Sequence, residues 1–343
     1  MYRDITLNDL LEQKKREPHT TIDVRSPSEF KESTIPGSIN IPVFTDEERA
    51  EIGTLYKQVS KDVATKRGLE IFSAKLPTFI EEFKHIDTSM TVFCWRGGMR
   101  SKTAATVLDL MGIHANRLSG GIRTYRQWIV KELESATFKP DLFVLNGYTG
   151  SGKTILLHKL AKDGYPVIDL ENLAGHRGSI FGQIGLEPNN QKKFDSLLLH
   201  EIEKVNDRPF VFIEGESKRI GKVLVHPFLY DKKENGVQIF IHLPVEERVK
   251  IILDDYDPKT SPDKFIDAFK MIKKRIHVPI ANEIEIALDE NNFNEAVKLL
   301  LEHYYDPRYK YSTTNEQREK NKIIQANTID DAYGQLIELI KTF

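Results

Sequence analysis

The sequence predicts two α/β domains, each built on a parallel β-sheet, and the second carries a mostly helical tail. In both parts of the chain, short runs of β-branched and aromatic residues alternate with stretches whose apolar residues recur at helical spacing. Such alternation is typical of a parallel sheet with helices on both faces. The 343 residues suit two domains, since one domain commonly holds roughly 100–200 residues. We place the boundary in the polar, proline-containing stretch 131–141, which gives domains at 1–135 and 136–343.

The composition is that of an ordinary globular protein, with 40% hydrophobic, 29% charged and 9% aromatic residues. No apolar run approaches the roughly 18 residues that span a bilayer, and residues 1–20 lack the pattern of a signal peptide. A lone cysteine cannot form an internal disulfide. We therefore expect a cytoplasmic protein with no membrane partner. The net charge of −2 argues against non-specific polyanion binding, although it is compatible with a local basic face.

The N-terminal domain shows two short strands, each followed by a turn. Residues 20–25 have the pattern of a buried strand, and 34–42 carry Pro-Gly turn chemistry between apolar residues. Residues 91–94 form a second β-rich run, and 101–113 have apolar residues at helical spacing. Residues 117–130 combine a glycine turn with a predicted helix.

The second domain restarts the alternation after the boundary. Four apolar runs predict strands, at 141–146, 166–170, 209–214 and 237–243. Beyond residue 245 the apolar spacing becomes helical, which predicts the tail. We find no internal repeat and no low-complexity segment.

The strand at 141–146 leads into a phosphate-binding P-loop pattern, and an amphipathic helix follows it. Glycines let the backbone wrap so that several N–H groups point at phosphate oxygens, and the helix N-terminus adds partial positive charge. A glycine-rich turn without a function would not need a strand directly before it and an amphipathic helix directly after it. We expect Lys153 to reach the outer phosphates, and the Thr154 hydroxyl suits a Mg²⁺ ligand position. The predicted phosphate-binding residues are Gly147, Gly150, Ser151, Gly152, Lys153 and Thr154.

Other polar residues follow neighbouring strands of this domain. Glu214 and Glu216 come where a nucleotide hydrolase usually has an aspartate, which weakens a plain ATPase or kinase interpretation. Asp169 ends a strand, and His176 and Arg177 lie among the glycines of 171–185. Loops at the carboxyl ends of strands face the ligand in open α/β sheets. We expect these residues to support the phosphate site, while a surface loop with a capping role is an equally open alternative for His176 and Arg177.

Cys94 lies between the strand at 91–94 and the next helix, in the stretch CWRGGMRS. Trp95, Arg96, Gly97, Gly98 and Arg100 complete a loop that suits an anion or a reactive sulfur. A helix N-terminus and nearby arginines lower the pKa of a thiol and so favour the nucleophilic thiolate. A free cysteine is more often a small buried apolar residue, but the flanking arginines and glycines favour a catalytic nucleophile at the mouth of an anion-binding loop.

Three segments together resemble the successive signatures of a rhodanese domain: residues 21–42, the Cys94 loop and residues 118–128. The resemblance covers residues 1–135 and implies that Cys94 carries a persulfide or related chalcogen. Five residues separate Cys94 from Arg100, one more than in simple rhodaneses. A loop of this length resembles that of rhodanese-related cysteine phosphatases, so a phosphatase stays open on this evidence.

The motifs CWRGGMRS, GYTGSGKT, DLENLAGHRGSIFG and EGESKRIG occur in this order, and the chain resembles the tRNA 2-selenouridine synthase family. The resemblance implies an enzyme that replaces the sulfur of 2-thiouridine at the wobble position of certain tRNAs by selenium. Selenophosphate is the implied donor, and an S-geranyl tRNA made from geranyl diphosphate is the implied intermediate.

Both small substrates carry phosphate anions that suit the 147–154 loop. We expect no tightly bound cofactor and no dedicated metal site, with Mg²⁺ left open. Cys94 is expected to form a perselenide or to activate the selenium step.

Three basic clusters, at 217–222, 270–277 and 307–322, are candidates for tRNA contact, although most charge runs are solvated faces. The first is favoured because it follows Glu214 at the carboxyl edge of a predicted strand. Two alternatives stay open: a phosphatase or sulfurtransferase fused to a nucleotide-binding P-loop domain, and a non-enzymatic P-loop regulator with a degenerate rhodanese scaffold, against which Cys94 counts. The sequence does not predict the oligomeric state. The residues expected to contact tRNA are Lys218, Arg219, Lys222, Lys273, Lys274 and Arg275.

Overall fold

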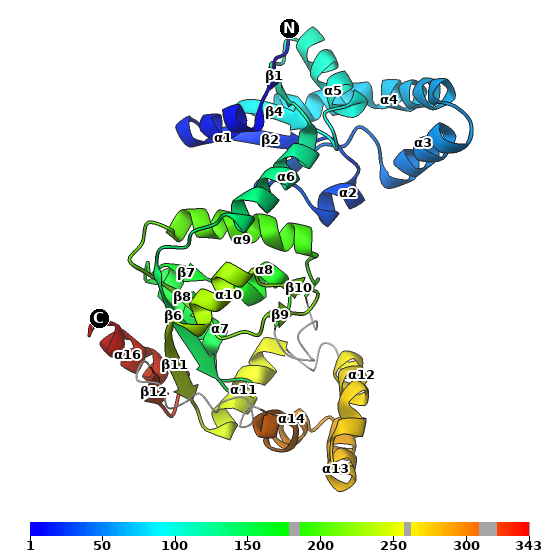
Figure 1. The fold of residues 1–343 in the computed structure, drawn as a ribbon. Coiled ribbons are helices and arrows are strands. Elements are labelled where there is room, and N and C mark those ends of the chain that lie inside the picture. The colour runs from blue at the N-terminus through cyan, green and yellow to red at the C-terminus, as the bar shows by residue number, and fades with distance from the viewer. Residues whose placement is uncertain (178–185, 257–261, 309–320, 343) are drawn as a thin grey trace. The chain divides into compact units, whose positions relative to one another are not determined.

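A parallel five-stranded sheet forms the core of each of two units in the computed structural model (Figure 1). The structure describes residues 1–177, 186–256, 262–308 and 321–342. The first unit comprises Met1–Ser135 and Asp195–Leu199, and the second comprises Ala136–Phe194 and His200–Phe343. Both units are α/β, which confirms the fold class predicted from the sequence.

The first sheet has the strand order β1-β5-β4-β2-β3, with every pairing parallel. The central strand β4 ends at Phe93, so Cys94 is the first residue beyond the carboxyl end of the most protected strand. No prediction covered the stretch that forms α3 and α4. The strands are β1 (Asp4–Ile5), β2 (His19–Asp23), β3 (Ile39–Asn40), β4 (Ser89–Phe93) and β5 (Asn116–Leu118), and the helices are α1 (Leu7–Arg16), α2 (Pro27–Glu32), α3 (Asp46–Gln58), α4 (Lys61–Lys84), α5 (Met99–Leu110) and α6 (Gly121–Glu134).

The second sheet has the order β12-β11-β6-β8-β7, again entirely parallel. Four of its strands were predicted from apolar runs. The fifth, β12, is an addition to the predicted helical tail: its four residues are mostly exposed, and only their pairing with β11 makes them a strand. The strands are β6 (Asp141–Gly147), β7 (Val167–Ile168), β8 (Phe210–Glu214), β11 (Val237–His242) and β12 (Lys322–Gln325).

Helices surround this sheet, and a separate antiparallel hairpin pairs β9 (Arg219–Ile220) with β10 (Val223–Leu224). The tail builds its own apolar core, in which Phe265, Phe269 and Ile284 are almost fully buried. Within the described ranges, every helix is too short or too polar to cross a lipid bilayer. The helices are α7 (Lys153–Lys162), α8 (Leu170–Ala174), α9 (Gln191–Val205), α10 (Pro227–Glu234), α11 (Val245–Tyr256), α12 (Pro262–Ile272), α13 (Val278–Asp289), α14 (Phe293–Leu300) and α16 (Ile329–Ile340), with a 3₁₀-helix at Lys273–Arg275 and a π-helix at Leu301–Tyr305.

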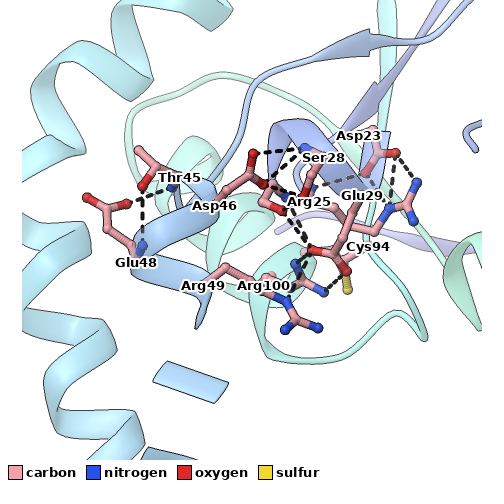
Figure 2. A network of polar contacts seen from close by, with 12 residues as sticks. Asp23, Arg25, Ser28, Glu29, Thr45, Asp46, Glu48, Arg49, Cys94 and Arg100 are labelled. Carbon is pink, nitrogen blue, oxygen red and sulfur yellow. Dashed lines mark hydrogen bonds and ion pairs between the residues drawn. The ribbon is translucent and has the colours of Figure 1, made fainter. Parts of the chain in front are cut away.

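A buried ion pair fixes the chain where β2 ends, in the first unit. Asp23 and Arg25 are 0% and 1% exposed, and Arg25 Nε and Nη2 donate to Asp23 Oδ1 and Oδ2 at 2.9 and 2.6 Å (Figure 2). Thr34 Oγ1 donates to the same carboxylate at 2.9 Å. Asn40 Nδ2 donates to the carbonyls of Asp23 and Arg25 and so ties β3 to this corner.

Replacing Asp23 by alanine should therefore be strongly destabilising, because it leaves the Arg25 guanidinium buried without its counter-ion. Breaking a buried pair in this way costs about 3–5 kcal/mol, which urea denaturation of the full chain can measure. Glu51→Ala is the matched control, because its pair with Arg67 is about half exposed on both sides. Equal losses in the two variants would contradict the assigned role of Asp23.

Candidate active sites

The Cys94 loop connects the carboxyl end of β4 to the N-terminus of α5. Its backbone is held from outside by three donors. The amides of Ile122 and Arg123 donate to the carbonyls of Cys94 and Trp95 at 2.9 and 3.0 Å, and Arg117 Nη1 donates to the Gly97 carbonyl at 3.0 Å.

These outer contacts set the direction of the loop amides. A peptide group points its N–H away from its carbonyl, so carbonyls held toward β5 and α6 turn the amides to the other side. Among the described residues, the amides of residues 95–101 donate to no protein acceptor. Together with the N-terminus of α5, they form a cradle suited to an anion, and anion binding there stays a prediction.

Arg117 is itself fixed by an ion pair with β1. Its Nε and Nη2 donate to Asp4 Oδ1 and Oδ2 at 2.6 and 2.5 Å. The hydrogen bonds from Arg117, together with its charge, lower the pKa of Asp4 despite partial burial. The loop thus depends on Asp4, which lies 90 positions before Cys94 and which local patterns could not identify.

The Cys94 thiol is buried rather than open at the mouth of the loop, which corrects the sequence expectation. The residue is 3% exposed and packs with Ile22 and Val92 in the apolar core of the first unit. Its Sγ lies 3.2 Å from Ser101 Oγ at the start of α5. Cys94 therefore combines a core position with one polar contact, and its catalytic role stays a prediction.

Arg100 has a protein counter-ion in this structure. Its two terminal nitrogens contact the carboxylate of Glu29 on α2, with Nη2 3.1 Å from Oε1 (Figure 2). Burial disfavours the Glu29 carboxylate, but hydrogen bonds and charge from Arg100 outweigh it and lower the pKa of Glu29. The amide of Ser26 also donates to Glu29, which completes a helix capping box.

Glu29 was missed because a glutamate in the first turn of a helix ordinarily signals only a cap. Its pairing with Arg100 means that the backbone amides, more than Arg100, supply uncompensated positive charge to the Cys94 loop. The other predicted loop residues are placed as follows: Trp95, Arg96 and Gly98 are exposed, and Gly97 is half-buried with φ +64°.

The phosphate loop joins β6 to α7 in the second unit, as predicted. Gly147, Gly150 and Gly152 all have positive φ. At Gly150 a Cβ atom would lie 2.9 Å from the Arg248 carbonyl, so only glycine fits that turn. Lys153 begins α7, and its Nζ lies 3.5 Å from the Gly147 carbonyl. Ser151 is 1% exposed, and its Oγ has no protein hydrogen-bond partner among the described residues.

Arg248 of α11 holds the phosphate loop through one of its carbonyls. Its Nε donates to the Thr149 carbonyl at 2.9 Å, and its guanidinium lies 5.1 Å from the centroid of the Tyr148 ring. Asp306 pairs with both terminal nitrogens of Arg248, at 2.9 and 2.6 Å. Arg248 and Asp306 were not predicted, because each has the local pattern of a charged helical residue and the two form a pair only in the folded tail.

Carboxylates line the neighbouring strand ends of the second unit. The Thr154 hydroxyl donates to Glu171 Oε2 at 3.0 Å, and His158 Nε2 lies 2.8 Å from Asp169 Oδ2. Asp169 Oδ1 also caps α8 by accepting the amide of Asn172. Thr154 and Glu171 offer oxygen donors of the kind Mg²⁺ prefers, and no group of three or more His, Cys, Asp or Glu within the described ranges has the geometry to hold a metal ion. Glu171 and His158 were not predicted.

Glu214 is fully buried at the end of β8. Its Oε2 accepts the amide of Leu170 at 2.8 Å, while Oε1 has no hydrogen-bond partner within bonding distance among the described residues. Burial, reinforced by the charge of Asp169, raises the pKa of Glu214 well above its usual value. Burial also raises the pKa of half-buried Glu216, against the opposing charge of Lys153. The strand end is thus less negative than its two glutamates suggest.

His176 and Arg177 follow α8, and the structure gives each a packing partner. His176 is 7% exposed and lies against Gly221 of the β9–β10 hairpin, and burial lowers its pKa. Arg177 Nε pairs with Asp255 Oδ2 of α11 at 2.7 Å. Their contact with a ligand stays a prediction, and the rest of their loop, 178–185, lies outside the described residues.

The basic residues predicted to contact tRNA differ in their exposure and in whether a carboxylate pairs with them. Lys218, Arg219 and Lys222 are exposed on the β9–β10 hairpin. Lys273 is paired with Glu285 at 2.6 Å, which compensates its charge. Lys274 and Arg275 are exposed, and most of the cluster at 307–322 lies outside the described residues.

Comparisons with known proteins match both units. Residues 140–336 match the tRNA 2-selenouridine synthase AAA domain, and residues 6–127 match the rhodanese-like domain. The chain is 31% identical to a tRNA 2-selenouridine synthase of Nitrosomonas europaea over 338 residues, covering 84% of this chain and 87% of that protein. The enzyme of the same name from Sulfurovum sp. is 33% identical over 325 residues, covering 84% and 87%. That of Bdellovibrio bacteriovorus is 34% identical over 255 residues, covering 72% and 67%.

Gly121→Ala should displace the Cys94 loop. A Cβ atom there would lie 2.2 Å from the Cys94 carbonyl oxygen and 2.6 Å from the Gly97 nitrogen, in a backbone with φ +59°. We expect a lower free energy of unfolding and faster alkylation of Cys94 by a thiol reagent. Gly37→Ala is the control, with φ +77° and no atom within 4 Å, so it carries only the backbone cost of about 1–2 kcal/mol. Indistinguishable variants would show that the loop does not need this close approach.

Glu214→Gln should become more stable relative to wild type as pH rises above the usual carboxyl range. A raised folded-state pKa means that the folded protein holds the Glu214 proton more tightly than the unfolded chain, so wild-type stability is lost as pH climbs through the folded pKa. Glutamine has no proton to lose and keeps an oxygen for the Leu170 amide. Urea denaturation at several pH values measures the difference, with Asp207→Asn, whose side chain is 96% exposed, as control. A pH-independent difference for Glu214→Gln would mean that Glu214 is ionised in the fold.

Proposed function

Because the chain belongs to the tRNA 2-selenouridine synthase family, we propose that it replaces the sulfur of a wobble 2-thiouridine in tRNA by selenium. Geranyl diphosphate and selenophosphate are the small substrates, so the enzyme is both a geranyltransferase and a selenotransferase. The reaction takes place in the cytoplasm. The observation that carries this proposal is the phosphate loop held by Arg248, with Lys153 at its end and the buried Glu214, whose pKa burial raises, at the neighbouring strand end.

In the first step, the thiocarbonyl sulfur of the base attacks C1 of the geranyl group. A C–S bond forms, the C–O bond to the diphosphate breaks, and the N3 proton of the base passes to solvent. The loop amides and Lys153 stabilise the negative charge that develops on the departing diphosphate. Burial raises the pKa of Glu214 and so favours its neutral form, which adds no repulsive charge. No nucleotide hydrolysis is needed, which suits a strand that ends in glutamate rather than aspartate.

In the second step, selenium of selenophosphate attacks C2 of the S-geranylated base. The C–Se bond forms, geranylthiolate leaves with its electron pair, and water cleaves the Se–P bond to release phosphate. The amides of residues 95–101 suit the phosphate part of the donor, and the Cys94 thiol lies at the base of the same loop. Cys94 activates the selenium donor there by hydrogen bonding to it.

A rhodanese-related phosphatase is the second candidate, and the observation that favours it is the five-residue spacing between Cys94 and Arg100. The pairing of Arg100 with Glu29 counts against it, because a phosphatase needs that guanidinium for the substrate phosphate. Hydrolysis of a generic aryl phosphate would favour this candidate.

Variants of the two loops should separate the two steps. Cys94→Ala should abolish selenation while S-geranyl tRNA still forms, whereas Lys153→Ala should slow geranylation by about 100-fold, the cost of removing one preorganised donor. Mass spectrometry of tRNA nucleosides, after incubation with geranyl diphosphate and selenophosphate, measures both products. Lys162→Ala, exposed at the other end of α7, is the control and should behave as wild type. Undiminished selenation by Cys94→Ala would remove the thiol from the mechanism.

A further inference from the structure

Four exposed residues lie on the Cys94 loop or are hydrogen-bonded to its backbone, and we call them the Cys94 rim: Trp95, Arg96, Met99 and Arg123. Trp95 and Met99 are 37% and 58% exposed. Arg96 and Arg123 are also exposed, and neither guanidinium has an ion-pair or hydrogen-bond partner within the described part of the chain. The proposed chemistry assigns no role to these four side chains.

Hydrogen bonds hold the backbone that carries the rim residues. The Trp95 carbonyl accepts the Arg123 amide at 3.0 Å, and the neighbouring Cys94 carbonyl accepts the Ile122 amide at 2.9 Å. These bonds also place Arg123 directly beside Trp95, although the two residues lie 28 positions apart. The exposed indole therefore belongs to a hydrogen-bonded loop, and two exposed arginines lie on the same or the adjacent backbone.

Cys94 is 3% exposed, so a substrate that approaches this loop meets its exposed side chains before the thiol. An inorganic anion would be served by the loop amides alone and gives no reason for an exposed indole. An exposed indole on a loop whose backbone also carries or contacts two exposed arginines suits an unpaired nucleobase with its adjacent phosphates, since bases of single-stranded RNA stack on aromatic side chains and arginine neutralises the backbone.

We propose that the Cys94 rim is a docking site for an unpaired nucleobase of tRNA. Trp95 stacks on the base, Met99 covers its edge, and Arg96 and Arg123 contact the phosphates on either side. This inference rests on the proposed function and places a tRNA contact on the first unit, apart from the basic residues considered on the second.

Tryptophan fluorescence tests the stack without any turnover. The chain has two tryptophans, Trp95 and Trp128, so Trp128→Phe leaves Trp95 as the single reporter. A stem-loop RNA with an unpaired uridine loop should quench Trp95 emission, while a fully paired duplex with the same number of phosphates should need at least about a tenfold higher concentration. If Trp128→Phe folds poorly, the difference between wild type and Trp95→Phe isolates the same signal.

Kinetics of the full chain provide the second test. Trp95→Ala should raise the KM for tRNA by about tenfold, whereas Trp95→Phe keeps a stacking ring and should stay within about threefold of wild type, with kcat changed little in both. Arg96→Ala and Arg123→Ala should each reduce the salt dependence of tRNA binding by about one phosphate contact. Leu110→Ala, 78% exposed at the far end of α5, is the control for losing an exposed apolar side chain.

Equal quenching by duplex and stem-loop, or quenching by geranyl diphosphate alone, would overturn the inference. So would a Trp95→Ala variant with an unchanged KM for tRNA. These outcomes are separate from failure of the proposed function: formation of selenouridine without selective quenching rejects only the docking site, and selective quenching without selenouridine rejects only the reaction.

Discussion

The direction of the peptide group is the constraint on which both candidate sites depend. A loop can offer its amides to an anion only if its carbonyls find donors on the opposite side, since buried backbone groups must be paired. In the first unit, Ile122, Arg123 and Arg117 supply these donors to the Cys94 loop. In the second unit, Arg248 supplies one to the phosphate loop. Each cradle is thus shaped by residues that a bound anion would not touch.

Carboxylates adjust the charge of each cradle in different ways. Glu29 stays ionised because Arg100 outweighs its burial, and the pair leaves the anion to the amides. Among the described residues Glu214 has no cationic partner, and burial together with the charge of Asp169 favours its protonated form. In one cradle an ion pair offsets the carboxylate charge, and in the other burial raises the pKa of the carboxyl group. Both devices limit the repulsion that a phosphate-bearing substrate would meet.

Local patterns were sufficient for the fold class and for the two loops, because strand, glycine turn and helix are contiguous in each. The strand β12 was not predicted because it has no such local pattern. Its short, mostly exposed run becomes a strand only through pairing with β11. Arg117, Glu29, Arg248 and Asp306 likewise carry no local signal. Each is a charged residue on an ordinary element, and its role comes from a partner distant in sequence.

The sequence by itself determined which atoms are available: one thiol, a glycine-rich turn ending in lysine and threonine, and acidic residues after the strands. Those properties follow from residue identity and short-range backbone preference. Only the tertiary structure decided that the thiol is covered, that Arg100 is compensated by Glu29 and that Glu214 lies where ionisation is costly. Burial and ion pairing are set by three-dimensional neighbours, since desolvation and Coulomb energy depend on distance in space rather than along the chain.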